Sequence, residues 1–281
     1  MSVDLLLITW NRSYYLEKMI THLLSSEEDF NIYWWDNAST DKTRDIFNST
    51  IDQRIKLKYS SDTNVGQKIP TYWFFENAKS KLIGKIDDDI IFPNDWVARL
   101  SMAVNSVPNV GMLGGWVFLQ SEWSANQAEK KKIEINGVKI LRRLSIQGHS
   151  FLGYKSVLKN YLNDSNLGFP IDQNRMSIDG YINGTLIPPI FLENMDDPRS
   201  EHFVMPALER IEQLPFTYRK FNFQNITEYS DWIHQDSIAC LASSYLRSLK
   251  KFKINADISF SGKFFRKIIQ IDERLANLYW K

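Results

Sequence analysis

Strand-like and helix-like segments alternate through the first hundred residues, and this alternation constrains the fold more than any other feature. Residues 3–9 form a near-continuous apolar run, which is typical of a strand buried on both faces. Residues 31–35, 55–59 and 82–86 are expected to form three further strands. The alternation predicts an α/β fold whose sheet is mostly parallel and flanked by helices on both faces.

Helix signals fill the gaps between these strands. After Ser13, apolar residues recur at helical spacing in Leu16, Met19, Ile20, Leu23 and Leu24. Ser39-Thr40-Asp41 can cap a second, short helix, and residues 69–78 have the pattern of a third. Pro93 suits the first turn of a fourth helix that continues to about residue 105.

The pattern changes after residue 110, and we expect three parts: a first half (1–115), a second half (116–235) and a helical C-terminal extension (236–281). In the second half, residues 110–119 resemble a strand, and Asn136-Gly137 between two apolar runs predicts a hairpin. Residues 151–162 and 200–213 have helical patterns.

Composition and charge exclude several classes of protein. A net charge of +1 over 281 residues argues against a nucleic-acid-binding protein. The single cysteine, Cys240, excludes an internal disulfide and argues against a structural zinc site. Residues 1–8 lack the pattern of a secretion signal, and no apolar run approaches the roughly 20 residues of a membrane span. We therefore expect a cytoplasmic protein.

Basic and aromatic residues interleave at positions 250–253 and 263–267. Such segments suit peripheral contact with an anionic membrane surface, which would bring the chain to the inner face of the membrane. The alternative is an amphipathic helix that packs on the core and extends its lysines into water.

The acidic triplet Asp87-Asp88-Asp89 follows the fourth expected strand directly. In parallel sheets, ligands bind beyond the carboxyl ends of the strands, and adjacent carboxylates that repel one another indicate a cation. On an extended chain, Asp87 and Asp89 would point to one side and Asp88 to the other. The triplet therefore predicts a divalent-cation and phosphate site, with a solvated acidic turn as the alternative.

Three more motifs fall at the same predicted edge. Asp36 ends the second strand, where a carboxylate suits a ribose hydroxyl or a base N–H. Thr9 ends the first strand and Arg12 comes three residues later, and Asn64-Val65-Gly66 follows the third strand. The alternative for each motif is a turn that only caps the next helix.

In order and spacing, these motifs resemble those of family-2 glycosyltransferases with the GT-A fold, over about residues 2–115. The segments that carry the resemblance are Ile8-Thr9-Trp10-Asn11-Arg12, Trp35-Asp36-Asn37-Ala38-Ser39-Thr40-Asp41, Asn64-Val65-Gly66 and Ile86-Asp87-Asp88-Asp89. Trp10 departs from the pattern, since a smaller or tyrosine-like residue is usual there. The resemblance implies a Rossmann-like GT-A fold and transfer of a sugar, with inversion, from a nucleoside diphosphate to a hydroxyl acceptor.

The resemblance also implies roles for single residues. Thr9 and Asp36 would contact the nucleoside, and the triplet would hold Mn²⁺ or Mg²⁺ together with the diphosphate. The expected donor-binding set is Thr9, Arg12, Asp36, Asn64, Gly66, Asp87 and Asp88, and the expected metal ligands are Asp87, Asp89 and His202. A UDP-sugar is the favoured donor, and a polysaccharide, a glycoconjugate or a lipid-linked carbohydrate the favoured acceptor.

Two roles fall in the second half of the chain. Inverting transfer needs a carboxylate that removes the proton of the acceptor hydroxyl, and Asp179, expected just before a helix, is the candidate, with Asp172 as its competitor. His202 is the candidate late metal ligand, and His234 is second; a surface or core histidine is the alternative for both. Gly114-Gly115-Trp116 is a candidate wall for the acceptor, or else part of the core.

Two other functions remain open from the sequence. A sugar-nucleotide nucleotidyltransferase of the pyrophosphorylase type also uses an acidic metal site on an α/β sheet. It would need a glycine-rich basic loop after the first strand, whereas no glycine precedes Gly66. A non-catalytic nucleotide-binding protein would not need the full acidic triplet.

Overall fold

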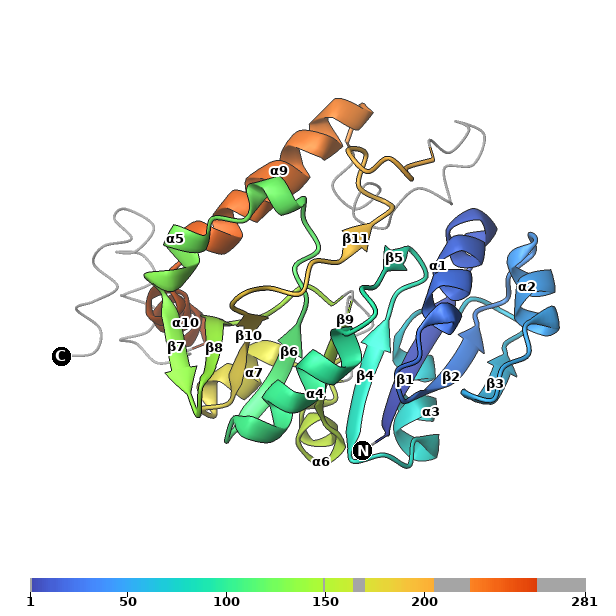
Figure 1. Cartoon of the computed structure of the whole chain (residues 1–281), viewed down its shortest axis with the longest axis horizontal. Coiled ribbons are helices and arrows are strands. Elements are labelled where there is room, and N and C mark those ends of the chain that lie inside the picture. The colour runs from blue at the N-terminus through green and yellow to red at the C-terminus, as the bar shows by residue number, and fades with distance from the viewer. Residues whose placement is uncertain (1, 149, 164–169, 205–222, 257–281) are drawn as a thin grey trace.

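The computed structural model describes residues 2–148, 150–163, 170–204 and 223–256. Its centre is a nine-stranded sheet in the order β3-β2-β1-β4-β9-β6-β10-β8-β7 (Figure 1). The strands are β1 (Val3–Thr9), β2 (Phe30–Asp36), β3 (Ile55–Ser60), β4 (Leu82–Ile86), β6 (Val110–Gly114), β7 (Lys132–Ile135), β8 (Val138–Arg143), β9 (Ser150–Tyr154) and β10 (Ile182–Leu186). Strands β8 and β9 run against the other strands, so the predicted mostly parallel sheet is confirmed.

Helices cover both faces of this sheet. The described helices are α1 (Ser13–Ser25), α2 (Thr43–Ser49), α3 (Lys68–Asn77), α4 (Trp96–Ser106), α5 (Ala125–Glu129), α6 (Lys155–Leu158), α7 (Gln173–Ile178), α9 (Ile226–Ala242) and α10 (Tyr245–Ala256), with short 3₁₀ turns η1 (Gln120–Glu122) and η2 (Lys159–Tyr161). In the described part of the chain, no helix is long and apolar enough to cross a membrane.

Alternation along the strands builds two cores. The odd residues of β1, such as Leu5, pack on the face that carries α1, α2 and α4. Leu6 of β1 and Tyr33 of β2 pack on the opposite face, against Phe74 of α3 and Met176 of α7. Since both faces are covered, β1 is a nearly continuous apolar run, as the sequence indicated, whereas the edge strand β3 alternates apolar residues with lysines.

The structure differs from the predictions in three places. Residues 151–162 were expected to be helical, but β9 occupies Ser150–Tyr154 and pairs between β4 and β6. Gly84 and Gly153 allow this close approach, since a Cβ on either would lie 2.4 Å or less from a neighbouring backbone oxygen. The strand expected at 110–119 ends at Gly114, and α4 begins three residues after Pro93. Most of the helix expected at 200–213 lies outside the described residues.

The hairpin and the helical C-terminal part are confirmed. Asn136 and Gly137 have positive φ angles of 50° and 78° between β7 and β8, as a two-residue turn requires. The boundary expected at residue 115 falls just after β6, inside one continuous sheet. Residues 257–281, which include the second basic–aromatic segment, lie outside the described residues.

After β10, the chain runs back across the carboxyl ends of the strands. Trp116 and Phe191 form a parallel bridge, and β11 (Glu193–Asn194) then pairs with β5 (Ile90–Ile91), the short strand that follows the acidic triplet. Figure 1 shows β5 and β11 together beyond the ends of β1 and β4. We call residues 187–196 the return segment. It brings residues of the second half of the chain to the carboxyl ends of β1, β2 and β4.

Candidate functional site

A charged cluster lies at the carboxyl edge of the sheet, centred on Arg12. Its guanidinium Nη1 lies 2.9 Å from Oδ2 of Asp89 and 3.9 Å from Oδ1 of Asp88, and its Nη2 lies 2.7 Å from Oδ1 of Asp196. The four residues come from the β1–α1 loop, the acidic triplet and the return segment. We call them the Arg12 cluster.

The Arg12 cluster holds more negative than positive charge. Asp88, Asp89 and Asp196 are each buried, with exposed fractions of 5–6%. One guanidinium can balance only one of the three carboxylates. Burial, with the nearby Asp89, raises the pKa of Asp88 to about 8, although Arg12 opposes the shift. The cluster would therefore gain stability from a further cation.

Asp87 lies against a different cation. Its carboxylate contacts the ammonium of Lys85, a buried residue on β4 that also donates to the Gly148 carbonyl over 3.4 Å. The expected alternation along the triplet is therefore wrong, because Asp88 and Asp89 share Arg12 whereas Asp87 pairs with Lys85. The chain turns after Asp87 instead of staying extended, so the rule for strands does not hold there.

The donor atoms at this edge fit a divalent cation. Oδ1 of Asp89 is buried, and no described residue hydrogen-bonds to it. An unpaired carboxylate oxygen in a cluster with excess negative charge is what Mg²⁺ or Mn²⁺ binds well. Asp89 therefore has an oxygen open to a cation, and Asp88 and Asp196 lie around the same guanidinium.

Asp36 has the same property at the end of β2. Its side chain is fully buried, and Oδ2 accepts hydrogen bonds from Ser39 N at 3.3 Å and Ser60 Oγ at 3.1 Å, and contacts Arg44. Its Oδ1 has no hydrogen-bond partner among the described residues. Asp36 therefore keeps one acceptor for a ligand N–H or O–H.

The loops around Asp36 are tied to one another by side chains. The amide of Asn37 donates to Asn64 Oδ1 at 2.8 Å and to the Gly66 carbonyl at 3.1 Å, and Gly66 has a φ of 70°. The structure thus brings the Asn64-Val65-Gly66 turn against the segment that follows β2. By contrast, the Thr9 hydroxyl is buried and accepts from Trp34 Nε1 at 3.1 Å, so it supports the sheet.

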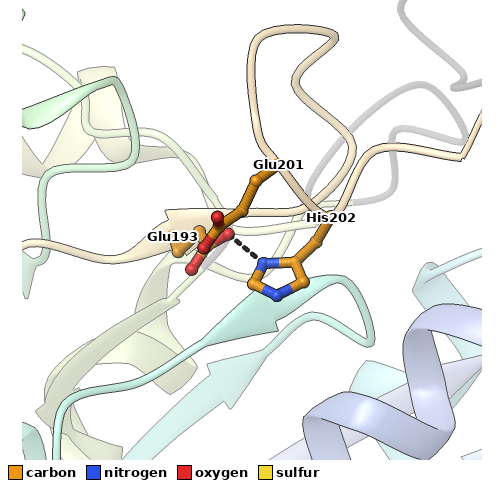
Figure 2. A group of neighbouring side chains, drawn as sticks. All are labelled: Glu193, Glu201 and His202. Carbon is orange, nitrogen blue, oxygen red and sulfur yellow. Dashed lines mark hydrogen bonds and ion pairs between the residues drawn. The ribbon is translucent and has the colours of Figure 1, made fainter.

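His202 lies close to this edge but in a group of its own (Figure 2). Its Nδ1 contacts Glu193 of β11, and the ligand atoms of Glu193, Glu201 and His202 all lie within 4.8 Å of one another. The acidic triplet is not part of this group in the described residues. The structure therefore places His202 with two glutamates that the sequence did not single out.

The other histidines have different surroundings. His234 lies on α9 and contacts Glu122, which also pairs with Arg199 at 2.5 Å. His22 lies on α1, with Nε2 2.8 Å from the Phe92 carbonyl. His149 lies outside the described residues.

The structure corrects the position expected for Asp179. Asp179 follows the end of α7 and precedes strand β10, so the expected helix after it is wrong. The next strand begins with Ile182 N donating to Asn109 O, just before β6. Asp179 therefore lies at the edge opposite to the Arg12 cluster, where it is exposed and bonded to Tyr161 and Arg175.

Asp172 lies at the other end of α7. Its carboxylate caps the helix by accepting from Arg175 N at 2.9 Å. The next residue, Gln173, exchanges two hydrogen bonds with the backbone of Ile146, near Gly114 at the carboxyl end of β6. The start of α7 therefore faces the edge that holds the Arg12 cluster, and Asp172 is half-buried there.

Trp116 belongs to the core. Its ring is 2% exposed, packs edge-on against Phe118 and Trp123, and donates to the Leu119 carbonyl at 3.3 Å. Gly115 lies against Leu192, since a Cβ there would come 2.5 Å from that side chain. Gly114-Gly115-Trp116 is therefore part of the core, which is the alternative that the sequence left open.

Sequence reasoning missed Lys85, Asp196 and Glu193. The signal for Lys85 was a lysine inside an otherwise apolar strand, which needs an anion. Asp196 and Glu193 gave no comparable signal, because their positions depend on the pairing of β11 with β5.

The fold is a mostly parallel α/β sheet whose carboxyl edge holds a cluster of buried acidic residues. The family model described as glycosyl transferase family 2 matches residues 4–164. The chain therefore belongs to glycosyl transferase family 2, and the resemblance seen in residues 2–115 is confirmed. No curated protein sequence matches the chain.

Solved structures agree with this assignment. The chain is similar to the mannosyltransferase PcManGT from Pyrobaculum calidifontis, in complex with GDP-Man and Mn²⁺, with a TM-score of 0.55 and 13% identity over 98% of this chain and 86% of that chain. It is also similar to S. aureus TarS 1-349, with a TM-score of 0.52 and 13% identity over 99% and 88% of the two chains. At this identity the likeness shows the GT-A glycosyltransferase fold.

Proposed function

We propose that the chain is an inverting glycosyltransferase that moves a sugar from a nucleoside-diphosphate donor to a hydroxyl group of an acceptor. The observation that supports it is the incomplete hydrogen bonding at one edge of the sheet. Asp36 and Asp89 each keep a buried carboxylate oxygen without a partner among the described residues. One oxygen suits a nucleoside N–H or O–H, and the other suits a cation on the diphosphate.

The donor would lie across the carboxyl ends of β1, β2 and β4. Asp36 would accept from the base or ribose, and the Asn64-Val65-Gly66 turn would border it, with Thr9 holding the strand beneath. Arg12 would face the phosphates and orient Asp88 and Asp89. Among donors, a UDP-sugar is the favoured candidate; the TarS structure with UDP-GlcNAc and the PcManGT structure with GDP-Man show that both nucleotides occur in similar folds.

Mn²⁺ or Mg²⁺ would be held chiefly by Asp89, with Asp87 and His202 as further candidate ligands. Bound there, the ion would neutralise the charge that develops on the departing nucleoside diphosphate. The chain itself supplies the excess negative charge that attracts the ion, and Lys85 fixes the carboxylate of Asp87.

For the catalytic base, Asp172 replaces Asp179 in this proposal. A base must come within hydrogen-bond reach of the acceptor hydroxyl, directly or through one water molecule. Asp172 lies at the end of α7 that faces the donor edge, whereas Asp179 lies at the opposite end. Asp172 would take the acceptor proton while the hydroxyl attacks the anomeric carbon from the face opposite to the diphosphate.

The acceptor is proposed to be a polysaccharide, a glycoconjugate or a lipid-linked carbohydrate that reaches the site from the side of residues 116–235. Residues 1–115 would bind the donor. A cytoplasmic location with peripheral contact through the basic C-terminal part remains a prediction.

Thermal unfolding with nucleotides tests the proposal. We expect one of UDP, GDP, CDP and dTDP to raise the midpoint of unfolding when Mn²⁺ is present, and to have little effect without it. A response only to nucleoside triphosphates would favour a nucleotidyltransferase. If no nucleotide changes the midpoint with or without Mn²⁺, the proposal is wrong.

A further inference from the structure

An aromatic groove lies beside the edge strand β3, on the face of the sheet that carries α3. Trp35 and Tyr59 line it from the sheet, and one side of α3 lines it with Lys68, Ile69, Tyr72, Trp73 and Glu76. Its volume is about 370 Å³, which falls in the range of small-molecule sites. We call this site the α3 groove.

Three rings form the floor of the α3 groove. The rings of Trp35 and Tyr59 lie 4.3 Å apart at 31°, and Trp73 meets Trp35 edge-on at 5.4 Å. Tyr59 and Ile69 remain about half exposed, at 47% and 50%. Exposed aromatic surface that gathers around a hollow indicates a binding site.

Trp35, which lines the groove, has a buried polar atom without a hydrogen-bond partner in the described part of the chain. Trp35 is only 4% exposed, and its indole Nε1–H makes no hydrogen bond to any described residue. A buried donor that is left unpaired costs free energy, so this N–H favours a ligand that carries an acceptor oxygen.

The α3 groove is separate from the donor edge. Because side chains alternate along β2, Trp34 packs into the core on the α1 face, and its neighbour Trp35 faces α3. Asp36 shares the face of Trp34. The groove therefore lies on the α3 face of the sheet. Helix α3 begins two residues after Gly66, so one end of the groove is close to the carboxyl edge.

We propose that the α3 groove binds a sugar ring of a neutral oligosaccharide. Aromatic faces pack against the C–H faces of a pyranose, and hydroxyl groups provide acceptors for the Trp35 N–H. Lys68 and Glu76 lie eight residues apart on α3, roughly 12 Å along its axis, so polar groups of opposite sign stand at the two ends. That pairing suits a neutral ligand with many hydroxyls better than an anion, and Glu76 already has Lys159 at 3.7 Å.

The site would hold a carbohydrate segment away from the reacting sugar. This function does not depend on the roles proposed for the Arg12 cluster, since no residue is shared. A chain-like acceptor could occupy the α3 groove and the carboxyl edge of the sheet at the same time. Binding in the groove would then raise the effective concentration of the acceptor at the carboxyl edge.

Indole N–H signals in a ¹⁵N–¹H spectrum of the full chain provide the test. The probes are neutral oligosaccharides built from glucose, galactose, mannose and N-acetylglucosamine. We expect at least one of them to shift the signals of Trp35 and Trp73 in a saturable manner. Tyr72→Ala should weaken that binding about tenfold, and Trp35→Phe, which keeps a ring but removes the N–H, should also weaken it. Tyr14→Ala, which removes a 54% exposed ring on α1, should leave it unchanged.

Nucleoside diphosphate binding by Tyr72→Ala separates this proposal from the proposed function, since it should match the unaltered chain. The inference is wrong if no saccharide shifts the two signals up to its solubility limit. It is also wrong if nucleosides shift them instead, or if Tyr72→Ala changes only self-association, which would make the groove a contact between copies of the chain.

Discussion

Buried carboxylates at the two edges of the sheet differ in how fully their oxygens are hydrogen-bonded. At the edge opposite to the Arg12 cluster, Asp4 is fully buried and accepts four hydrogen bonds of 2.6–2.8 Å. Burial alone would raise the pKa of Asp4, but donors on Asn31 and on residues 79–80 outweigh it and lower the pKa. At the carboxyl edge, Asp36 and Asp89 each keep one oxygen that no described residue hydrogen-bonds, and the pKa of Asp88 is raised.

This contrast separates carboxylates that hold the fold from those that hold a ligand. A satisfied buried carboxylate stabilises the folded chain, whereas an unsatisfied one reduces stability and persists where it binds something. Variants at the two edges should therefore differ in sign as well as in size.

The largest expected effect concerns the two ends of α7. Asp172→Asn should lower kcat by about 10³, since it removes a general base but keeps the shape of the helix cap. Binding of the nucleoside diphosphate should stay unchanged, which titration calorimetry can measure. Asp179→Asn is the matched control and should alter kcat less than about twofold. Equal losses in the two variants would place the base elsewhere.

Asp89→Asn should lower kcat/KM by about 10² to 10³, because charge stabilisation at the diphosphate is lost. The same variant should unfold at the same temperature as the unaltered chain or at a higher one, because it removes one charge from a crowded cluster. Asp45→Asn, an exposed residue on α2, serves as the control for both measurements. A clear drop in unfolding temperature would show that Asp89 is structural.

Arg12→Met should lower the free energy of unfolding by about 3 kcal/mol, since it leaves buried carboxylates without their cation. Urea unfolding measures this change, and Arg175→Met, at an exposed ion pair, should cost less than about 1 kcal/mol. If Arg12→Met is as stable as Arg175→Met, the Arg12 cluster does not depend on the guanidinium.

Asp4→Asn should lower the free energy of unfolding by about 2 kcal/mol, because the NH₂ group of asparagine would face N–H and O–H donors in place of an accepting oxygen. The kcat should not change. The pKa of Asp4 is lower in the folded chain than its unfolded value of about 3.9, so its carboxylate stabilises the fold above that value. This contribution should fade as the pH falls below about 4, and Asp4→Asn should unfold with less dependence on pH in that range. If the stability of the unaltered chain and that of Asp4→Asn depend equally on pH, the Asp4 carboxylate does not stabilise the fold.

The first half of the fold was predictable because its signals are local. Strands β1, β2 and β4 are largely apolar, β3 alternates apolar residues with lysines, and Asp36 and the acidic triplet lie directly at strand ends. Parallel strands bring such residues together whatever the details of the loops. The donor edge could therefore be placed from the sequence.

The second half was less predictable because its contacts are distant in sequence. Strand β9 inserts between β4 and β6 only because Gly84 and Gly153 permit it, and its apolar spacing also fits a helix. Asp179 was misplaced because the strand after it was not recognised, so the direction of α7 remained unknown. Asp196 reaches Arg12 because β11 pairs with β5. Each of these strands has only two residues, so neither gives a recognisable strand pattern in the sequence.

A structure of the full chain with Mn²⁺ and a nucleoside diphosphate would show directly whether the carboxyl edge binds the donor. We expect the ion on Asp89, the diphosphate beside it and Arg12, and the nucleoside within hydrogen-bond reach of Asp36. An ion held only by Glu193, Glu201 and His202, or a nucleotide bound away from the carboxyl edge, would contradict this expectation.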